Sequence, residues 1–356
     1  MTEENAHYPV GQLAERLHRL GWDMGWGSNR DSIFLTAEGL TENLSSALGL
    51  LYEAVAYPTL SGPAVSHHLN RLIEAETRSR ANPTYQADAT LQHYLWGQSY
   101  RITAYESIET LRRIDTTLLT SYYEHFIRKG LNGVVIAAPY LPESLYKWSA
   151  WIGSVAYTMP LSLQMPEVCE ALPFPNAKQV SLRIAYPWVR PIHDLYGYYR
   201  MALMRLGGYF GAQLMRSVRE EAGLTYGIHA YPDNCVAGSY IVISTEVAKE
   251  RASEAVSRIH TEVERWSKNP FPTEDILIEV RNYLLLHSMP ETLNEWADRV
   301  LRIVAAGFGP EKVIQHAQQV NAISNLSDFP FIDLPTHPVV QVAVGAEASI
   351  FAAECV

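Results

Sequence analysis

The chain has 356 residues, enough for two ordinary domains that each bury their own core. Its 47% hydrophobic and 19% charged residues are typical of a soluble globular protein and exclude a disordered or fibrous one. A net charge of −10 argues against nucleic-acid binding through phosphate neutralisation. No run approaches the roughly 20 apolar residues of a membrane-spanning helix, and the polar N-terminus has no apolar signal region. We therefore expect a cytoplasmic protein with no membrane or nucleic-acid partner.

The three cysteines, Cys169, Cys235 and Cys355, lie far apart in the sequence. Their odd number and wide spacing predict no disulfide framework and no metal site of the Cys-x-x-Cys kind.

The first half alternates helical and extended patterns. Leu13, Leu17 and Leu20 recur at helical spacing before Gly21, a helix stop. Residues 22–39 then predict two extended pieces around a Gly-Ser-Asn-Arg-Asp turn. The other elements predicted here are helices at 41–57, 62–80, 85–96 and 116–126, and a short buried strand at 133–138 (GVVIAA).

Residues 148–175 lose a clear period and contain four prolines, which is typical of a linker. We predict a first domain at 1–150, a linker at 151–175 and a second domain at 176–356. The second domain opens with a strand at 179–186 and a helix at 195–206. Its later elements are a helix and turn around 213–226, strands at 226–231 and 238–246, helices at 249–268 and from Thr273 onward, and a strand at 339–344.

The two halves share one order of elements: helix, glycine, strand, turn, strand, long helix, proline stop, helix. Gln12 and Leu13 correspond to Gln213 and Leu214, and Gly21 corresponds to Gly223. A repeat of this length indicates two copies of one domain-sized unit. We therefore predict an α+β fold of two repeated domains, each a mostly antiparallel sheet with helices on one face. The first copy lacks the opening strand and helix of the second, since the chain begins just before the shared helix.

The segment LGGYFGAQLMRSVREEAGLTYGIHAY, followed by GSYIVISTE and NPFPT, resembles the second repeat domain of the insulinase/pitrilysin/mitochondrial-processing-peptidase superfamily. GWGSNRDSIFLTAEGL and AYPTLSGPAVSHHLNRLIEAETRSRANP extend the resemblance to the first half. It implies a half clamshell from a zinc endopeptidase. Members of that family bind zinc on a helix with His-x-x-Glu-His, in which two imidazoles hold the metal and the glutamate is a general base.

That motif is absent around all 12 histidines of this sequence. His67 and His68 are adjacent and point to different helix faces, and Glu124-His125 lacks the first histidine. His260 is followed by Glu262 and Glu264 but has no second histidine. We interpret these side chains as solvent-facing or packing residues. The sequence thus predicts no metal or other cofactor in this chain, and the resemblance implies zinc in a homologous partner subunit.

Arg219 and Tyr226 lie seven residues apart in the most specific part of the resemblance. In active relatives an arginine and a tyrosine at this spacing reach the substrate from the half opposite the metal. A guanidinium and a phenol are suitable donors to the negative charge that develops on a carbonyl oxygen. The alternative is structural: a cation offsetting a helix dipole and an aromatic side chain in the core of the sheet.

The strand after Tyr226 offers a second role, because extended peptides can pair with a sheet edge. We predict that Gly227, His229 and Tyr231 bind substrate there. The leading hypothesis is a non-catalytic, substrate-binding subunit of a heterodimeric zinc metalloendopeptidase that processes peptides. The alternatives are a scaffold or peptide-binding subunit with no peptidase role, and a native protein whose lost N-terminal segment carries its own metal motif.

Overall fold

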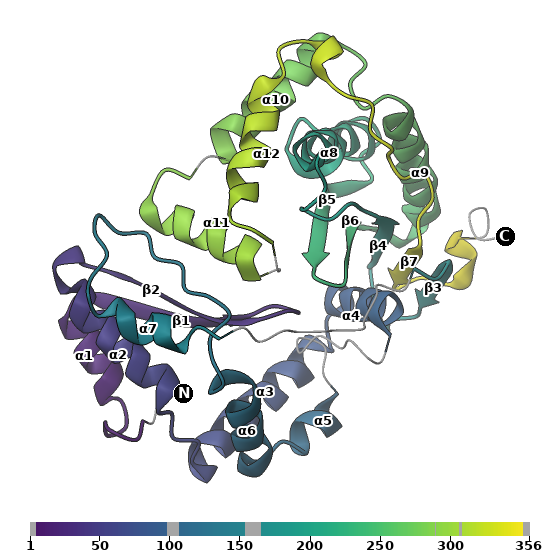
Figure 1. Ribbon diagram of the computed structural model, residues 1–356. Coiled ribbons are helices and arrows are strands. Elements are labelled where there is room, and N and C mark those ends of the chain that lie inside the picture. The colour runs from purple at the N-terminus through teal and green to yellow at the C-terminus, as the bar shows by residue number, and fades with distance from the viewer. Residues whose placement is uncertain (1–4, 98–106, 154–164, 289, 306–307, 352–356) are drawn as a thin grey trace. The chain divides into compact units, whose positions relative to one another are not determined.

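The computed structural model describes residues 5–97, 107–153, 165–288, 290–305 and 308–351 (Figure 1). The chain divides into two compact units, and each unit takes segments from both halves of the sequence. The first unit comprises Met1–Arg78, Thr103–Met159 and Glu291–Ala305. The second comprises Ser79–Ile102, Pro160–Pro290 and Ala306–Val356.

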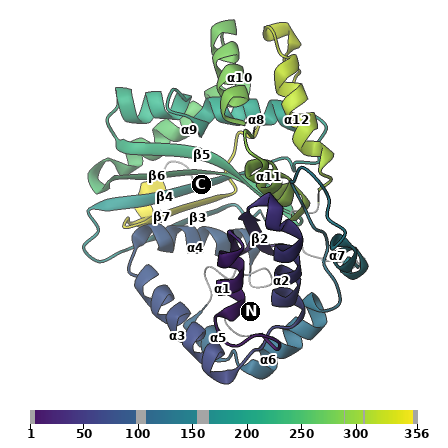
Figure 2. The ribbon, with the colours of Figure 1, turned by 90° about the vertical axis from the view of Figure 1, so that its left-hand side faces the viewer.

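The second unit is built on a five-stranded sheet of order β3-β7-β4-β6-β5 (Figure 2). Neighbouring strands run antiparallel, except that β3 and β7 are parallel. The central strand β4 is buried along most of its length, as expected of a strand covered on both faces. The strands are β3 (Val168–Leu172), β4 (Gln179–Pro187), β5 (Thr225–Cys235), β6 (Gly238–Ala248) and β7 (Val340–Val344).

Helices cover both faces of this sheet (Figure 2). On one face, Leu182, Ile184 and Ile243 form a core with α8 and α9. On the other face, Val342 packs against Leu91 of α4. The α+β class with a largely antiparallel sheet is confirmed, and α4 adds a cover on the second face that the sequence pattern did not predict. The helices of this unit are α4 (Pro83–Trp96), α8 (Tyr196–Leu203), α9 (Ala252–Lys268), α10 (Glu274–Ser288) and α12 (Glu311–Ala322).

The described part of the first unit has a hairpin of two strands, β1 (Trp22–Ser28) and β2 (Ile33–Gly39). Leu13 and Leu17 of α1 and Leu51 of α2 form its core. The helices of this unit are α1 (Gln12–Arg19), α2 (Leu44–Ala56), α3 (Gly62–Ser79), α5 (Ile108–Arg112), α6 (Thr116–Tyr122) with a π-helical extension η3 (Tyr123–Ile127), α7 (Leu145–Trp151) and α11 (Leu293–Ala305).

The predicted strand at 133–138 is wrong. Val134 and Ile136 pack against the core of the first unit, but this segment belongs to neither sheet of the described chain. The apolar pattern identified an extended segment that is only partly buried. It could not reveal that no strand of the described chain pairs with this segment.

The repeated order of elements is present in both units. The first copy runs α1, β1, β2, η1 (Thr41–Asn43), α2, α3, and the second runs η5 (Met215–Glu221), β5, β6, η6 (Lys249–Arg251), α9, α10. Gly21 and Gly223, which end the first helix of each copy, have φ of 70° and 60°. Both therefore adopt the left-handed conformation that glycine takes without a steric penalty.

The units differ from the predicted division at 150 and 176. Helix α4 follows α3 in the sequence but belongs to the second unit, and α11 follows α10 but belongs to the first. The predicted linker at 151–175 contains β3 (Val168–Leu172). This strand belongs to the second unit, because it pairs with β7. Periodicity finds each helix but carries no information about which sheet the helix covers.

The cysteines differ from expectation at one position. Cys235 is buried and forms no disulfide, whereas Cys169 of β3 is disulfide-bonded. The expectation of no disulfide is thus wrong for Cys169, because sequence spacing does not measure distance in the fold. None of the helices that the structure describes is long and apolar enough to cross a membrane.

Candidate functional site

Arg219 lies in the last turn of η5, a segment of wide π-helical turns just before β5. Its guanidinium carbon is 4.9 Å from the centre of the Phe210 ring, a geometry in which the ring face attracts the cation. Phe210 is 66% exposed, so this contact lies at the surface. Within the described ranges, no residue forms a hydrogen bond or an ion pair with the Arg219 side chain. Its donors are therefore open to a ligand.

A buried carboxylate holds η5 in place from beneath. Glu262 of α9 is 6% exposed, and it accepts hydrogen bonds from Gln213 Nε2 at 2.7 Å and Ser217 Oγ at 3.0 Å. Arg265 Nη1 donates to the same carboxylate at 3.2 Å. Arg258 Nε adds a 2.8 Å hydrogen bond to Ser217 Oγ. Because a buried carboxylate is stable only when it is paired, this network fixes the segment that carries Arg219.

The end of η5 is fixed by its backbone. The N–H of Gly223 donates to the Arg219 carbonyl, and the N–H of Leu224 donates to the Val218 carbonyl, both at 3.0 Å. The left-handed conformation of Gly223 makes this closure possible. The chain then turns directly into β5, so Arg219 and Tyr226 belong to one rigid helix–turn–strand unit.

Tyr226 lies on a bulge of β5. The pairing register with β6 shifts between Thr225 and Ile228, and the Tyr226 side chain is 91% exposed. Its hydroxyl has no hydrogen-bond partner among the described residues. This position excludes the structural alternative of a sheet-core aromatic for Tyr226.

Two threonine hydroxyls hold the bulge. Thr225 Oγ1 donates to the Glu246 carbonyl at 2.7 Å and accepts from the Gly227 N–H at 3.2 Å. Thr245 Oγ1 lies 2.9 Å from both Thr225 Oγ1 and the Gly227 carbonyl. The corresponding hairpin of the first unit pairs from Trp22 to Ser28 without a shift. The bulge is therefore a feature of the second copy, and such bulges often serve to direct a side chain.

The three predicted substrate-binding residues follow on the same strand. β5 pairs only with β6 among the described strands and forms an edge of the sheet. His229 is exposed and Tyr231 is 42% exposed, while Gly227 is half-buried. Ile228 and Ala230, which alternate with them, point into the core. The structure thus brings Gly227, His229 and Tyr231 onto one open strand directly after Tyr226.

A charged group lies on the sheet face next to Tyr231. Arg183 of β4 has a side chain only 3% exposed and forms ion pairs with Asp88 and, at 3.3 Å, with Glu246. Burial raises the pKa of the Tyr231 hydroxyl, and the Asp88 carboxylate raises it further. Tyr231 is therefore a neutral hydrogen-bonding group at physiological pH.

The histidines and glutamates considered as ligands have other roles. His67 and His68 are exposed, and Glu124 pairs with Arg128. His260 Nε2 lies 2.7 Å from Gln341 Oε1, and Glu264 pairs with Lys268. Their interpretation as solvent-facing or packing residues is confirmed. In the part of the chain that the structure describes, no three His, Cys, Asp or Glu side chains gather as a metal-binding group.

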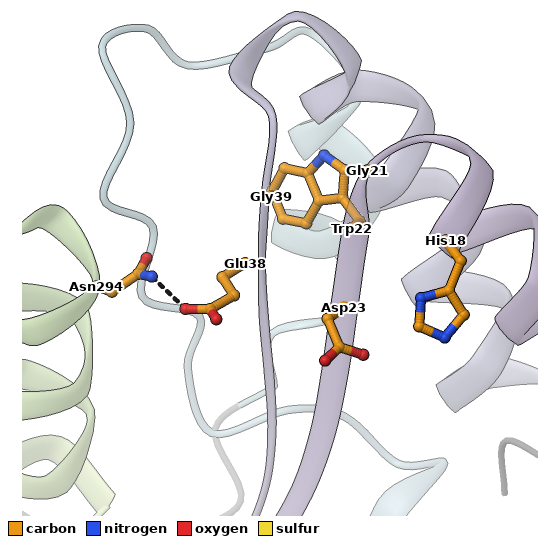
Figure 3. Close-up of a pocket in the computed structure, with 7 residues that line it drawn as sticks. All are labelled: His18, Gly21, Trp22, Asp23, Glu38, Gly39 and Asn294. Atoms are coloured by element: carbon orange, nitrogen blue, oxygen red, sulfur yellow. Dashed lines mark hydrogen bonds between the residues drawn. The ribbon is translucent and has the colours of Figure 1, made fainter.

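A surface depression in the first unit contains none of the predicted site residues. It is lined by the β1–β2 hairpin, His18 of α1 and Asn294 of α11 (Figure 3). Asp23 and Glu38 face each other across the hairpin, and Asn294 donates to Glu38. Two exposed carboxylates at one cross-strand position repel each other. This polar contact thus marks where α11 meets β2 and does not form a catalytic group.

Comparisons with known proteins identify the second unit. Residues 166–284 match the family described as the peptidase M16 inactive domain, and this match includes η5, β5 and both residues of the Arg219–Tyr226 pair. Residues 166–284 are therefore an M16 inactive domain. M16 is the insulinase/pitrilysin superfamily that the sequence resembles, and the match is to its inactive domain. The search of curated proteins found no match to this chain.

Solved structures share the fold of this chain at low sequence identity. A peptidase M16 inactive domain from Pseudomonas fluorescens is 18% identical with a TM-score of 0.79, and the match covers 97% of this chain and 86% of that one. A protease from Helicobacter pylori is 12% identical with a TM-score of 0.79, covering 96% and 86%. The periplasmic protease PqqL from Escherichia coli is 11% identical with a TM-score of 0.75, covering 96% of this chain but 39% of that one.

The residues that position Arg219 and Tyr226 in the candidate site were not predicted from the sequence. Phe210 stacks on Arg219, Thr225 and Thr245 hold the bulge, and Glu262 holds η5. From the sequence, Glu262 is interpreted only as a solvent-facing or packing residue next to His260. The position of Glu262 on α9 does not predict its hydrogen bonds with Gln213 and Ser217, because only the folded chain brings these residues together. A bulge likewise leaves no mark in a strand pattern that continues on both sides of it.

Proposed function

We propose that this chain is the non-catalytic, substrate-binding subunit of a heterodimeric zinc metalloendopeptidase that processes peptides. A homologous partner with His-x-x-Glu-His would hold the zinc and its activated water. The observation that carries this proposal is that Arg219 and Tyr226 both have uncommitted donors on a rigid frame. The nearby Arg251, Arg258 and Arg265, in contrast, all have carboxylate partners.

The chemistry assigned to the pair is charge stabilisation. Attack of water on a peptide bond places negative charge on the carbonyl oxygen, and preorganised donors stabilise that charge. The phenol O–H of Tyr226 donates one hydrogen bond, and the Arg219 guanidinium donates to the same oxygen or to a neighbouring backbone carbonyl. The stacking of Arg219 on Phe210 limits the motion of the guanidinium before substrate arrives, so less order has to be gained in the transition state.

The edge of β5 supplies substrate affinity. An extended peptide that adds to this edge gains main-chain hydrogen bonds, while its side chains alternate between the two faces of the sheet. Gly227, His229 and Tyr231 are the β5 residues that would meet it. The carboxylates of Asp88 and Glu246, which outnumber the single buried Arg183, favour neutral or basic peptide side chains near Tyr231.

The redox state of Cys169 bears on the cellular compartment of this chain. The sequence predicts the cytoplasm, whereas a disulfide at Cys169 favours an oxidising compartment. Cell fractionation combined with thiol labelling of the native chain distinguishes the two, because a cytoplasmic chain keeps the Cys169 thiol reduced and reactive after denaturation.

The central test mixes the purified chain with the product of a neighbouring coding sequence that carries His-x-x-Glu-His. The chain alone with added zinc is expected to be inactive, and peptidase activity is expected on mixing. Arg219→Ala and Tyr226→Phe should each lower kcat by about 100-fold, the scale of losing one oxyanion donor. If the isolated chain cleaves peptides and binds stoichiometric zinc, the heterodimer proposal fails.

Matched controls separate chemistry from folding. Arg216 is exposed on the same segment, and Tyr146 of α7 is 66% exposed. Arg216→Ala and Tyr146→Phe should therefore leave kcat within about two-fold of the wild type, since neither removes a donor from the site.

The open edge of β5 also supports a second candidate, a peptide-binding subunit with no peptidase role. Such a subunit would bind extended peptides equally well after Arg219→Ala and Tyr226→Phe. Unchanged turnover by both variants in an active mixture, with peptide binding retained, would favour this second candidate.

A further inference from the structure

A buried arginine of the second unit has no counter-ion. Arg205 belongs to η4 (Met204–Gly208), the π-helical segment that follows α8. It is 8% exposed, and no residue of the described ranges forms a hydrogen bond or an ion pair with its guanidinium. A buried charge is stable only when it is paired, and an arginine does not give up its proton instead. Arg205 is therefore incomplete without an anion.

The other buried arginine that the structure describes shows what Arg205 lacks. Arg183 is 2% exposed, and its guanidinium forms ion pairs with Asp88 and Glu246. Burial acts to lower the pKa of Arg183, but the two carboxylates raise it overall. The pKa of Arg205, in contrast, stays lowered by burial. Arg205 thus bears the unfavourable effect of burial without the carboxylates that offset it at Arg183.

The acidic groups closest to Arg205 are committed to other donors. Glu279 Oε1 accepts a 2.8 Å hydrogen bond from the Tyr209 hydroxyl, and Glu262 is held by the network beneath η5. Both carboxylates act on the Arg205 pKa through space, but neither forms an ion pair with it. The charge of Arg216 has the same sign and lowers this pKa further. The described part of the chain thus offers Arg205 no anion within reach.

Arg205 lies close to the Arg219 end of the candidate site. Its charge interacts with the phenol of Tyr209, and the next residue, Phe210, carries the Arg219 guanidinium on its ring. Within the Arg205 guanidinium, Nε is the nitrogen that is fully enclosed. A ligand therefore approaches end-on, at the two Nη groups. Two parallel N–H donors of this kind match the two oxygens of a carboxylate.

We propose that Arg205 is a carboxylate-binding subsite next to Arg219, which selects peptides with an acidic side chain or a free C-terminus. The inference rests on the proposed function, since a carboxylate is the anion that an unmodified peptide offers. The two Nη groups donate to the carboxylate oxygens and give the buried charge its counter-ion. This preference is separate from the one near Tyr231, where Asp88 and Glu246 on the face covered by α4 favour neutral or basic side chains.

Peptide binding to the isolated chain tests the subsite. The probes are short peptides with both ends blocked and one glutamate at each position in turn, the same peptides with glutamine, and a glutamine peptide with a free C-terminal carboxylate. In fluorescence anisotropy, a glutamate peptide or the free C-terminus should bind at least about ten-fold more tightly than its neutral analogue, the scale of a charge-assisted hydrogen bond. The tighter of the two identifies the source of the carboxylate.

Variants assign this preference to Arg205. Arg205→Met should abolish it, while Arg190→Met, which removes an exposed arginine of the same unit, should keep it. In the chain without peptide, Arg205→Met should leave the urea midpoint unchanged or raise it. Arg183→Met should lower the midpoint, because it leaves two carboxylates without their partner. In the wild type, acetate should shift the Arg205 Nε–H resonance in NMR spectra, and chloride at equal ionic strength should not.

Two results would overturn the proposal. The first is that no peptide with a carboxylate binds more tightly than its neutral analogue. The second is that Arg205→Met lowers the urea midpoint and Glu279→Gln removes this loss, because Arg205 would then be paired with Glu279. Neither measurement uses peptidase activity. An inactive reconstituted mixture with an intact carboxylate preference would therefore contradict the proposed function alone, and an active mixture without the preference would contradict the Arg205 subsite alone.

Discussion

The Arg219 guanidinium lies over the ring of Phe210, with 4.9 Å between the guanidinium carbon and the ring centre. No described residue forms a hydrogen bond with the donors of Arg219. The stacking on Phe210 therefore sets the direction of the guanidinium. A cation held by a ring face keeps all five of its N–H groups available. The stacking thus positions Arg219 without consuming the donors that a substrate needs.

Phe210→Ala should lower kcat/KM of the reconstituted peptidase about two- to five-fold, the equivalent of roughly 0.5–1 kcal/mol for an exposed cation–π contact. Because Phe210 is 66% exposed, the melting temperature should change little. Phe210→Tyr keeps a ring and should restore the rate, whereas Phe210→Leu should not. Equal rates for the leucine and tyrosine variants would mean that the ring face has no role.

Thr245→Val should release the bulge that carries Tyr226. Thr245 is 1% exposed, and the change keeps its shape while removing the hydroxyl that contacts Thr225 and Gly227. The expected cost is about 1–2 kcal/mol of unfolding free energy, with faster hydrogen exchange at Gly227. Thr36→Val in the β1–β2 hairpin is the matched control, because Thr36 is exposed and donates only a long 3.3 Å hydrogen bond. Equal effects of the two changes on exchange at Gly227 would contradict a specific role for Thr245.

The sequence predicted the repeat, but not the contacts that hold the candidate site. Glycines and hydrophobic period lie along the chain, so they predicted the helix–strand order correctly, while the roles of Arg219 and Tyr226 come from the family resemblance and stay a prediction. Contacts between distant segments do not leave such a pattern. The stacking of Phe210 on Arg219, the hydrogen bond from Ser217 to Glu262 and the packing of α4 on the second face of the five-stranded sheet each depend on tertiary structure.

Glu262→Gln should destabilise the second unit and weaken the support of η5. The buried Glu262 carboxylate accepts hydrogen bonds from Gln213, Ser217 and Arg265. The amide of a glutamine would point its own NH2 group at one of these three N–H or O–H donors, and that hydrogen bond would be lost. We expect a loss of about 1–3 kcal/mol in urea unfolding. Glu264→Gln on the same helix is the control. Its carboxylate is exposed and pairs only with Lys268, and such surface pairs contribute little. A cost for Glu264→Gln equal to that for Glu262→Gln would refute this account.

The stability of the second unit should fall as the pH drops from 6.5 to 4. His316 of α12 is 3% exposed, and burial lowers its pKa from 6.5 to about 4, even though the Pro191 carbonyl at 2.9 Å favours a proton on Nε2. Arg200 and Lys312 act in the same direction as burial.

Below pH 6.5 the His316 side chain binds a proton in the unfolded chain but not in the folded one. The stability that is complete above pH 6.5 is therefore lost progressively down to about pH 4. Each pKa unit corresponds to 1.36 kcal/mol, and the shift from 6.5 to about 4 therefore puts the total loss at roughly 3 kcal/mol. Urea unfolding at pH 7.5, 6 and 4.5 measures this slope, and His316→Gln should flatten it, because glutamine keeps a donor for Pro191 but does not titrate in this range. An unchanged slope in His316→Gln would assign the pH dependence to other groups.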